Sequence, residues 1–266
     1  DKDHAIIEFF PAHQAYQYTE QMGFRTFLKK DGKFLELFSS EDTTKKMNIK
    51  KNGLSIEELD ENEKLQCDID YFTLPNEKTG ALVRKIQITN QADTTVKIEL
   101  LDGLPAVIPY GVAMADLKEM GQTTQAWMQV EDLGKNVPYY RVRASMADTA
   151  AVTEVLGGNY GVAFDAAGQK KRVIADPELV FAYDSAMKKP IGFMEQNLEQ
   201  LLKRVQVTCN QYPCCFFAEE KMLAPEESLV LYEMIGQVER KECLDEFLAE
   251  EKSAVYFEQK QQEADE

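Results

Sequence analysis

Between about Phe24 and Tyr183 the chain repeats one pattern: a short segment of alternating apolar and polar residues, then residues that favour a turn. Alternation over about four to eight residues is typical of a half-buried strand, because successive side chains of a strand point to opposite faces. More than ten such segments follow one another, and neither an internal repeat nor a low-complexity linker divides them. The pattern predicts a mainly β protein, a large antiparallel β-sandwich with one inserted helix and a helical C-terminal tail.

Turn residues place several hairpins in this region. Asp31-Gly32 and Asn52-Gly53 each separate two strand-like segments, and both pairs suit the positive φ angles of a tight hairpin turn. The next strand, LQCDIDYFTLP, should stop at Pro75. The apolar segment SLVLYEMIG, near residue 230, is typical of a central strand that is packed on both faces.

The segments ALVRKIQITN and VKIELL, joined by the polar linker NQADTT, predict a further antiparallel hairpin. In the first segment Leu82, Ile86 and Ile88 share one face, and Arg84 is the exception. In the second segment the apolar residues should face inward and Glu99 outward. The residues that follow, 102 to 112, hold two prolines and two glycines and predict an ordered loop.

Helical spacing occurs in three places. Residues 113 to 131 predict the inserted helix, since Leu117, Met120, Thr124, Trp127 and Met128 recur at steps of one, three or four residues. FMEQNLEQLLKR predicts a shorter helix, whereas LVFAY, after Pro177, is expected to be a strand. Residues 239 to 266 predict a helical segment whose apolar stripe, ending in Phe257, has nothing obvious to cover it. We therefore divide the chain into a sandwich domain, 1–238, and a helical linker, 239–266.

The chain is acidic, with 46 Asp and Glu against 30 Lys and Arg and a net charge of −16. Such a charge disfavours nucleic acid and anionic membranes as partners. The sequence has neither an apolar run long enough to span a membrane nor a secretory signal at its start. The odd number of cysteines, without paired spacing, favours free thiols and a cytoplasmic location.

Motifs for catalysis are missing from the sequence. The two histidines, His4 and His13, are too few for a zinc site, and no HExxH, CxxC, GxSxG, P-loop or GxGxxG pattern is present. Carboxylates such as Asp68 and Asp70, or Glu57 and Glu58, are expected to be solvated surface charge. We therefore expect no catalytic residue, metal site or cofactor in this chain.

Aromatic residues are the remaining candidates for a binding site. Sugar rings stack on exposed tryptophan or tyrosine, because one face of a pyranose is apolar while its hydroxyl groups need polar neighbours. Trp127, Tyr110, Tyr139, Tyr140 and Arg141 are the candidate substrate-binding residues. The alternative interpretation is that Trp127 anchors its helix to the sheet and that one of the two adjacent tyrosines belongs to the core.

Two runs resemble a known family. RKIQITNQADTTVKIELLDGLPAVIPYGV and NQYPCCFFAEEKMLAPEESLVLYEMIGQVE are similar to strands of the N-terminal β-sandwich of the cellobiose phosphorylase family, a galactose-mutarotase-like supersandwich. The T-N dipeptide that ends one strand, and the L-A-P-x-E turn before another, carry the resemblance. It extends over roughly residues 65 to 266 and rests on structural motifs.

The resemblance implies a supporting role. In that family an (α/α)6 barrel follows the sandwich and performs inverting phosphorolysis of a β-linked disaccharide or glucan, with inorganic phosphate, to a sugar 1-phosphate. A chain of 266 residues has no room for that barrel, so we expect a piece of a longer protein that is inactive by itself. The sandwich would pack on the barrel, help to form a homodimer and contribute the loop DGLPAVIPYGV to the sugar site.

Two other functions stay open at this stage. The chain could be a stand-alone carbohydrate-binding module, since sandwiches host many unrelated functions. It could also be an aldose mutarotase-like epimerase, which needs a histidine and a glutamate from well-separated strands. The two histidines lie nine residues apart in sequence at the N-terminus, which supplies that chemistry poorly.

Overall fold

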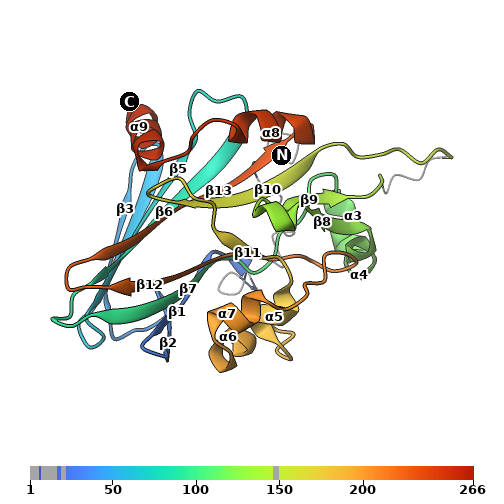
Figure 1. Cartoon of the computed structure of the whole chain (residues 1–266). Coiled ribbons are helices and arrows are strands. Elements are labelled where there is room, and N and C mark those ends of the chain that lie inside the picture. The colour runs from blue at the N-terminus through green and yellow to red at the C-terminus, as the bar shows by residue number, and fades with distance from the viewer. Residues whose placement is uncertain (1–5, 7–16, 19–21, 146–149) are drawn as a thin grey trace.

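The computed structural model describes residues 6, 17–18, 22–145 and 150–266, and it consists of two antiparallel sheets packed face to face (Figure 1). This arrangement confirms the predicted mainly β sandwich. The five-stranded sheet has the order β11 (Arg172–Ile174), β12 (Cys215–Leu223), β7 (Val96–Leu104), β1 (Arg25–Lys30), β2 (Lys33–Glu36). The eight-stranded sheet has the order β3 (Thr44–Ile49), β4 (Gly53–Asp60), β5 (Leu65–Thr73), β6 (Gly80–Asn90), β13 (Ser228–Val238), β10 (Gly158–Asp165), β9 (Tyr139–Val142), β8 (Met128–Glu131).

Short helices cover the outer faces of both sheets, so that the molecule has four layers (Figure 1). The five-stranded sheet is covered by α5 (Pro177–Phe181), α6 (Ile191–Glu195) and α7 (Leu198–Leu202). The eight-stranded sheet is covered by α8 (Lys241–Leu248) and α9 (Ala254–Asp265). Further short helices lie in the connection between β7 and β9: α3 (Met114–Glu119), α4 (Gly121–Thr124), and the 3-10 turns η2 (Gln125–Trp127) and η3 (Leu133–Lys135).

The two hairpins predicted from their turn residues are confirmed. β1 and β2 pair antiparallel, and Asp31 (φ 50°) and Gly32 (φ 85°) both adopt the left-handed conformation that a two-residue hairpin turn requires. β3 and β4 pair across residues 50–52, but neither Asn52 nor Gly53 has the positive φ angle that the sequence suggested, and Gly53 already belongs to β4. β13 lies between β6 and β10 in the larger sheet and is buried on both faces, as its apolar sequence predicts.

The third predicted hairpin is wrong. β6 and β7 follow one another in sequence but lie in different sheets: β6 pairs with β5 and β13, and β7 pairs with β1 and β12. Alternation correctly identified both strands, but it cannot distinguish a strand that pairs with its neighbour from one that crosses to the facing sheet. Glu99 of β7 points to the outer face of its sheet, as predicted, but it does not reach solvent there. It is buried against α7, where it accepts a hydrogen bond from the backbone N–H of Leu198 (3.1 Å), because helices cover the outer face.

Two of the helix and strand predictions are also corrected. Residues 113–131 form α3, α4 and η2 and then strand β8, because the helix breaks at Met120-Gly121 and the chain becomes extended at Met128. Glycine is a poor helix former, and the strand gains hydrogen bonds by pairing with β9. The segment after Asp176 is helix α5 and not a strand. The helix begins with Pro177 at its first position, and the Asp176 carboxylate caps it by accepting a hydrogen bond from the backbone N–H of Glu178.

The C-terminal segment packs closely on the eight-stranded sheet, and the expectation that its apolar stripe is uncovered is wrong. Phe257 is fully buried and its ring stacks on Tyr232 of β13 with ring centres 4.6 Å apart. Leu244 and Phe247 of α8 are buried in the same cluster. The sheet is therefore apolar on both faces, which explains why β13 lacks alternation. The division of the chain at residue 239 stays a prediction.

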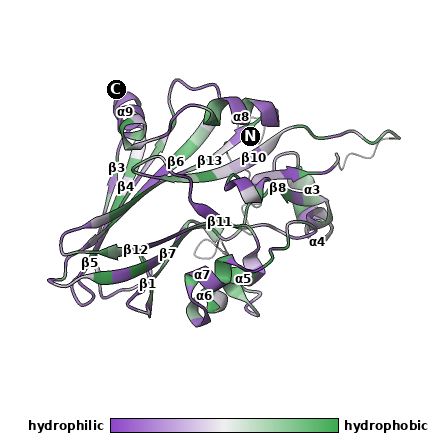
Figure 2. Cartoon of the chain, viewed as in Figure 1, coloured by the Kyte–Doolittle hydropathy of each residue, from purple (hydrophilic) through white to green (hydrophobic). Residues whose placement is uncertain are grey.

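The space between the sheets holds two apolar clusters separated by a polar layer. Apolar side chains of both sheets fill either end of the sandwich, and Figure 2 shows the apolar colouring along the strands that face one another. Between the clusters, inward positions of three strands carry Arg84 (β6), Asp102 (β7) and Glu233 (β13), all of them buried. Asp102 belongs to β7, although the sequence suggests that it begins a loop.

An ion pair joins the two sheets across this layer. The guanidinium group of Arg84 donates to both carboxylate oxygens of Asp102 at 2.9 Å, and the Thr26 hydroxyl of β1 donates to Asp102 at 2.7 Å. Arg84 also donates to the hydroxyl groups of Thr26 and Tyr71. Buried charges are tolerated only when they are paired and hydrogen-bonded, and Arg84 and Asp102 meet both conditions.

Glu233 is the exception in this layer. Its Oε2 atom lies 3.7 Å from Nε of Arg84, and among the described residues neither of its carboxyl oxygens has a hydrogen-bond partner. Burial and the nearby Asp102 carboxylate raise the pKa of Glu233 well above its ordinary value, although Arg84 opposes the shift. Its burial therefore favours the protonated form of Glu233 over the carboxylate.

The packing of α9 predicts the effect of removing its central ring. Phe257→Ala should lower the free energy of unfolding by about 3–5 kcal/mol, because it opens a cavity beside Tyr232. Val255→Ala, on an exposed position of the same helix, should change it by less than about 0.5 kcal/mol. Urea unfolding of both variants measures the difference. Equal effects would mean that α9 does not pack on the sheet.

The protonation of Glu233 predicts a pH dependence of stability. Between the ordinary pKa of glutamate, about 4.3, and the raised pKa, the unfolded chain loses a proton that the folded protein keeps. The stability of the native protein should therefore fall as pH rises through this range, by up to about 1.4 kcal/mol per pH unit from this group. Glu233→Gln cannot ionise and should lose less stability between pH 5 and 8 in thermal unfolding. Parallel pH profiles for the two proteins would contradict a protonated Glu233.

Candidate functional site

Side chains alternate between the two faces of strand β9, so the predicted site residues on this strand lie on different faces of the sheet. Tyr139 and Arg141 point to the outer face of the eight-stranded sheet, and Tyr140 points into the space between the sheets. The structure therefore brings Tyr139 and Arg141 together and places Tyr140 on the other side of the sheet. The two adjacent tyrosines cannot share one binding surface.

Tyr140 is part of the core between the sheets. Its ring is 1% exposed and its hydroxyl donates to the backbone carbonyl of Cys214 at 2.9 Å. Burial raises the pKa of Tyr140 well above its ordinary value. No face of this ring is open to solvent.

Tyr110 and Trp127 lie in the connection between β7 and β9, and neither of them lines the cavity that holds Tyr139 and Arg141. The backbone N–H of Tyr110 donates to the side chain of Asn159 (2.7 Å), and its half-buried ring lies against Gly157. Trp127 ends η2 with 37% of its surface exposed, and its carbonyl accepts the N–H of Arg143. A role for these residues in sugar binding stays a prediction.

A cavity of about 580 Å³ opens on the outer face of the eight-stranded sheet, beside the start of α8. Its volume is within the range of small-molecule sites. Three separate parts of the chain line it: β9, the segment before β10, and the first turn of α8. The lining residues are Tyr139, Arg141, Glu154, Leu156, Arg240, Lys241 and Glu242.

Arg141 holds one wall of this cavity in place. Its guanidinium group lies 3.5 Å from Glu131 of β8 and 3.1 Å from Glu154, and it donates to the carbonyl of Val155. The Tyr139 hydroxyl donates to the carbonyl of Leu156 at 2.9 Å, so β9 binds residues 154–156 at two points. Burial raises the pKa of Tyr139 to about 12, which keeps this hydroxyl a donor at neutral pH.

Lys241 closes the opposite wall. Its ammonium group lies 3.0 Å from Glu131 and 2.8 Å from Asp132, and 5.7 Å from the centre of the Tyr139 ring. Burial opposes ionisation of Asp132, but hydrogen bonds from Lys241 and Lys135 outweigh it and hold the pKa of this carboxyl below its usual value. The first residue of α8 is thereby fixed to the end of β8.

One charged group on the surface of the cavity remains available to a ligand. The Nε atom of Arg141 has no hydrogen-bond partner among the described residues, but it is buried behind the wall. The exposed Arg240 lines the cavity, and no carboxylate in the described part of the chain lies within ion-pair distance of it. Positive and negative side chains otherwise balance around the cavity, so the arrangement suits a neutral ligand with many hydroxyl groups.

Sequence reasoning identified two of the lining residues and missed the others. Glu154, Arg240, Lys241 and Glu242 are charged residues on an acidic protein, and such residues are most often solvated. No local pattern distinguishes them, because the residues that form the cavity are separated by up to about a hundred positions in sequence.

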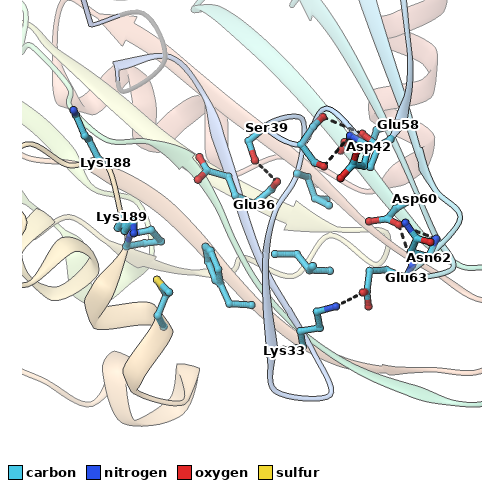
Figure 3. Close-up of a pocket in the computed structure, with 17 residues that line it drawn as sticks. Lys33, Glu36, Ser39, Asp42, Glu58, Asp60, Asn62, Glu63, Lys188 and Lys189 are labelled. Atoms are coloured by element: carbon cyan, nitrogen blue, oxygen red, sulfur yellow. Dashed lines mark hydrogen bonds and ion pairs between the residues drawn. The ribbon is translucent and has the colours of Figure 1, made fainter.

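A second cavity, of about 620 Å³, lies beside strand β2 (Figure 3). Glu58 of β4 lines it and is 3% exposed, so the prediction that Glu58 is solvated is wrong. It is buried because its carboxylate accepts hydrogen bonds from the backbone N–H of Phe38 (2.6 Å) and the hydroxyl of Thr43 (2.5 Å). This cavity contains none of the residues that the sequence singled out for sugar binding.

The other site predictions can be compared with the described residues only in part. Within 22–145 and 150–266, together with residues 6 and 17–18, no group of three or more potential ligands is placed to hold a metal ion. His4 and His13 lie outside the described residues. All five cysteines are described, and each is a free thiol. No helix of the described chain is long and apolar enough to cross a membrane.

No protein-family model and no curated protein matches this sequence. Two solved structures are similar to the chain over most of its length: a polysaccharide lyase (13% identity, TM-score 0.42) and a bacterial glucoamylase complexed with acarbose (10% identity, TM-score 0.41). The alignments cover 93% and 91% of this chain, but 31% of each of those two chains. This chain thus spans about a third of their length.

The contacts of Arg141 predict its effect on the cavity wall. Arg141→Met should speed amide hydrogen exchange of residues 154–156 by roughly tenfold or more, because charged hydrogen bonds to Glu154 and Val155 are lost. Arg143→Met removes an exposed arginine of the same strand region whose bonds go to Ala126 and Asn210 instead. Exchange at 154–156 that is equally fast in both variants would mean that Arg141 does not hold the wall.

Proposed function

We propose that this chain is a carbohydrate-associated β-sandwich that binds a neutral sugar in the cavity between β9 and α8. The observation that carries the proposal is the cavity itself, which combines donors, acceptors and a partly apolar wall within about 580 Å³. Sugar hydroxyl groups both donate and accept hydrogen bonds, and arginine and glutamate side chains placed side by side supply the matching partners. Leu156, which is 56% exposed, provides apolar surface for the carbon face of a ring, and the buried Tyr139 holds Leu156 in place through its hydroxyl group.

The charges support a neutral sugar over an acidic one. Arg141 and Lys241 are already paired with Glu131, Asp132 and Glu154, so only Arg240 is left without a carboxylate among the described residues. The chain as a whole carries a net charge of −16, which repels anions at long range. A sugar acid or a sugar phosphate would therefore find little excess positive charge in this cavity.

The finer proposal concerns the parent protein. We propose that the chain is a non-catalytic domain of a glycoside phosphorylase-like enzyme, as the sequence resemblance implies, and that it supports a catalytic barrel and a homodimer. Large apolar side chains are exposed near the β8 edge, where Trp127 and Val207 are 37% and 49% exposed. Exposed apolar groups that gather at one edge are typical of surfaces that another domain covers. Inorganic phosphate would serve the parent reaction and would have no site in this chain.

A stand-alone carbohydrate-binding module would use the same cavity and would need no partner domain. The mutarotase-like alternative requires a histidine base, and both histidines of the chain lie outside the described residues. The described cavity offers arginine, lysine, glutamate and tyrosine side chains. Among the alternatives, these groups support sugar binding better than ring opening.

Calorimetric titration of the whole chain tests the sugar site. Cellobiose should bind more tightly than glucuronate, and Arg240→Ala should weaken cellobiose binding by about tenfold, the effect of losing one charged hydrogen bond. Arg204→Ala, another exposed arginine that lies outside this cavity, should bind cellobiose as the native protein does. Glucose and longer β-linked glucans, titrated in the same way, identify the preferred size.

Failure of all the neutral sugars to bind would overturn the carbohydrate proposal. The same samples, incubated with cellobiose and inorganic phosphate, test the non-catalytic role. We expect no sugar 1-phosphate, and its release by the isolated chain would refute that part of the proposal. Binding without a preference for neutral sugars would contradict the charge argument.

A further inference from the structure

Strand β2 is an edge strand of the five-stranded sheet, and the larger cavity lies along its open side. Open edges are a ready template for another strand, because their backbone N–H and C=O groups are unpaired. The cavity of about 620 Å³ is lined by all four residues of β2, by part of the loop that follows β2, by the end of β4 and the turn after it, and by Lys188, Lys189, Pro190 and Met194. The proposed sugar site does not use this region of the chain.

The hairpin register shows which backbone groups are open. The N–H of Leu37 donates to the carbonyl of Thr26, its partner in register, so Leu35 and Lys33, two and four residues back along the strand, also direct their backbone groups toward β1. Phe34 and Glu36 therefore direct their backbone groups away from β1. The carbonyl of Glu36 accepts from the Ser39 hydroxyl, and the other groups of these two residues have no backbone partner in the described chain.

The cavity has two chemically different walls (Figure 3). On the side of the eight-stranded sheet lie four carboxylates. Glu58 is buried and hydrogen-bonded within the protein, and Glu63 pairs with Lys33, so the exposed Asp42 and the half-buried Asp60 are the carboxylates that a ligand can reach. On the side of α6 lie Lys188 and Lys189, which are exposed and form no ion pair with a described carboxylate. The carboxylates of the first wall are Asp42, Glu58, Asp60 and Glu63.

A strand added to β2 would point its side chains alternately at these two walls. Leu35 of β2 packs toward the space between the sheets, whereas Phe34 packs on Phe193 of α6 with ring centres 6.4 Å apart. A strand paired with β2 has the same two faces, because the side chains of directly paired residues point to the same side of a sheet. One set of its side chains would meet the carboxylates, and the other set would meet Lys188 and Lys189.

We propose that the β2 edge binds an extended peptide of another protein, as an added strand in which basic and acidic residues alternate. The open backbone groups of Phe34 and Glu36 supply the main-chain hydrogen bonds of this binding mode. Opposite charges on the two walls fix which face of the peptide turns inward, since like charges placed together are costly. A sugar would satisfy neither the row of backbone groups nor the separation of charge between the walls.

The probe is a fluorescein-labelled hexapeptide of alternating lysine and glutamate, measured by fluorescence anisotropy with the full chain. A peptide of the same composition with three lysines followed by three glutamates should bind at least about tenfold more weakly, because alternation is lost. Two further versions of the alternating peptide carry N-methyl groups on every second residue, one on the odd-numbered and one on the even-numbered residues, and they test the backbone bonds. The version whose methyl groups replace the N–H groups that face β2 should lose binding, and the other version should bind as the parent peptide does.

The test variant combines Lys188→Glu and Lys189→Glu. The control variant is Lys203→Glu, because Lys203 is an exposed lysine that lies outside this cavity. The double charge reversal should weaken binding of the alternating peptide by about tenfold or more, and Lys203→Glu should leave it unchanged. Circular dichroism of each variant checks that the sheet is intact.

Three results would overturn the proposal. Equal binding of the block and alternating peptides would indicate non-specific attraction of charge. Competition by cellobiose or a longer glucan would mean that the cavity takes a sugar instead. Dimerisation of the chain that depends on Lys188 and Lys189 and blocks the peptide would mean that the edge pairs with a second copy.

Discussion

The ion pair between Arg84 and Asp102 is the contact on which the arrangement of the two sheets depends. It lies in the middle of the space between them, and each group needs the other, because a lone charge at this depth would cost several kcal/mol. Arg84 is on β6 and Asp102 on β7, which belong to different sheets, so the pair joins the two sheets across the sandwich.

The sandwich is covered by helices on its outer faces, and both cavities lie where this cover ends. The first opens beside the start of α8, where Tyr139 and Arg141 of β9 face outward. The second opens along β2, beyond the end of the helices that cover the smaller sheet. In each place charged side chains from distant parts of the chain meet over an apolar floor. Such edges and helix starts offer unpaired polar groups that the covered parts of the sheet lack.

Local features of the fold were predictable from local sequence. The Asp31-Gly32 turn requires positive φ angles that few other pairs tolerate, so the first hairpin follows from two residues. The apolar strand β13 indicated a sheet that is buried on both faces. The helix expected over residues 113–131 was only partly right, since helical spacing of apolar residues does not reveal that β9 offers the last residues a strand partner.

The candidate site was predictable only in part. Tyr139 and Arg141 were identified as a pair of polar aromatic and cationic residues, but Tyr140 between them belongs to the core. Alternation along β9 explains this result, yet the sequence does not tell which of the two faces is outward when both faces are buried. Arg240 and Lys241 join the site because the C-terminal segment folds back on the sheet, and their own neighbours in sequence give no sign of it.

The sequence by itself determined the class of the protein: a chain of short strands, with tight turns at fixed positions and enough apolar residues for a sandwich. The tertiary structure alone decided which strands pair, which carboxylates are buried, and where the C-terminal segment packs. The physical reason is that turns and alternation depend on neighbouring residues, whereas the choice of sheet, the pairing of charges such as Arg84 with Asp102, and the burial of Phe257 depend on residues far apart in the chain.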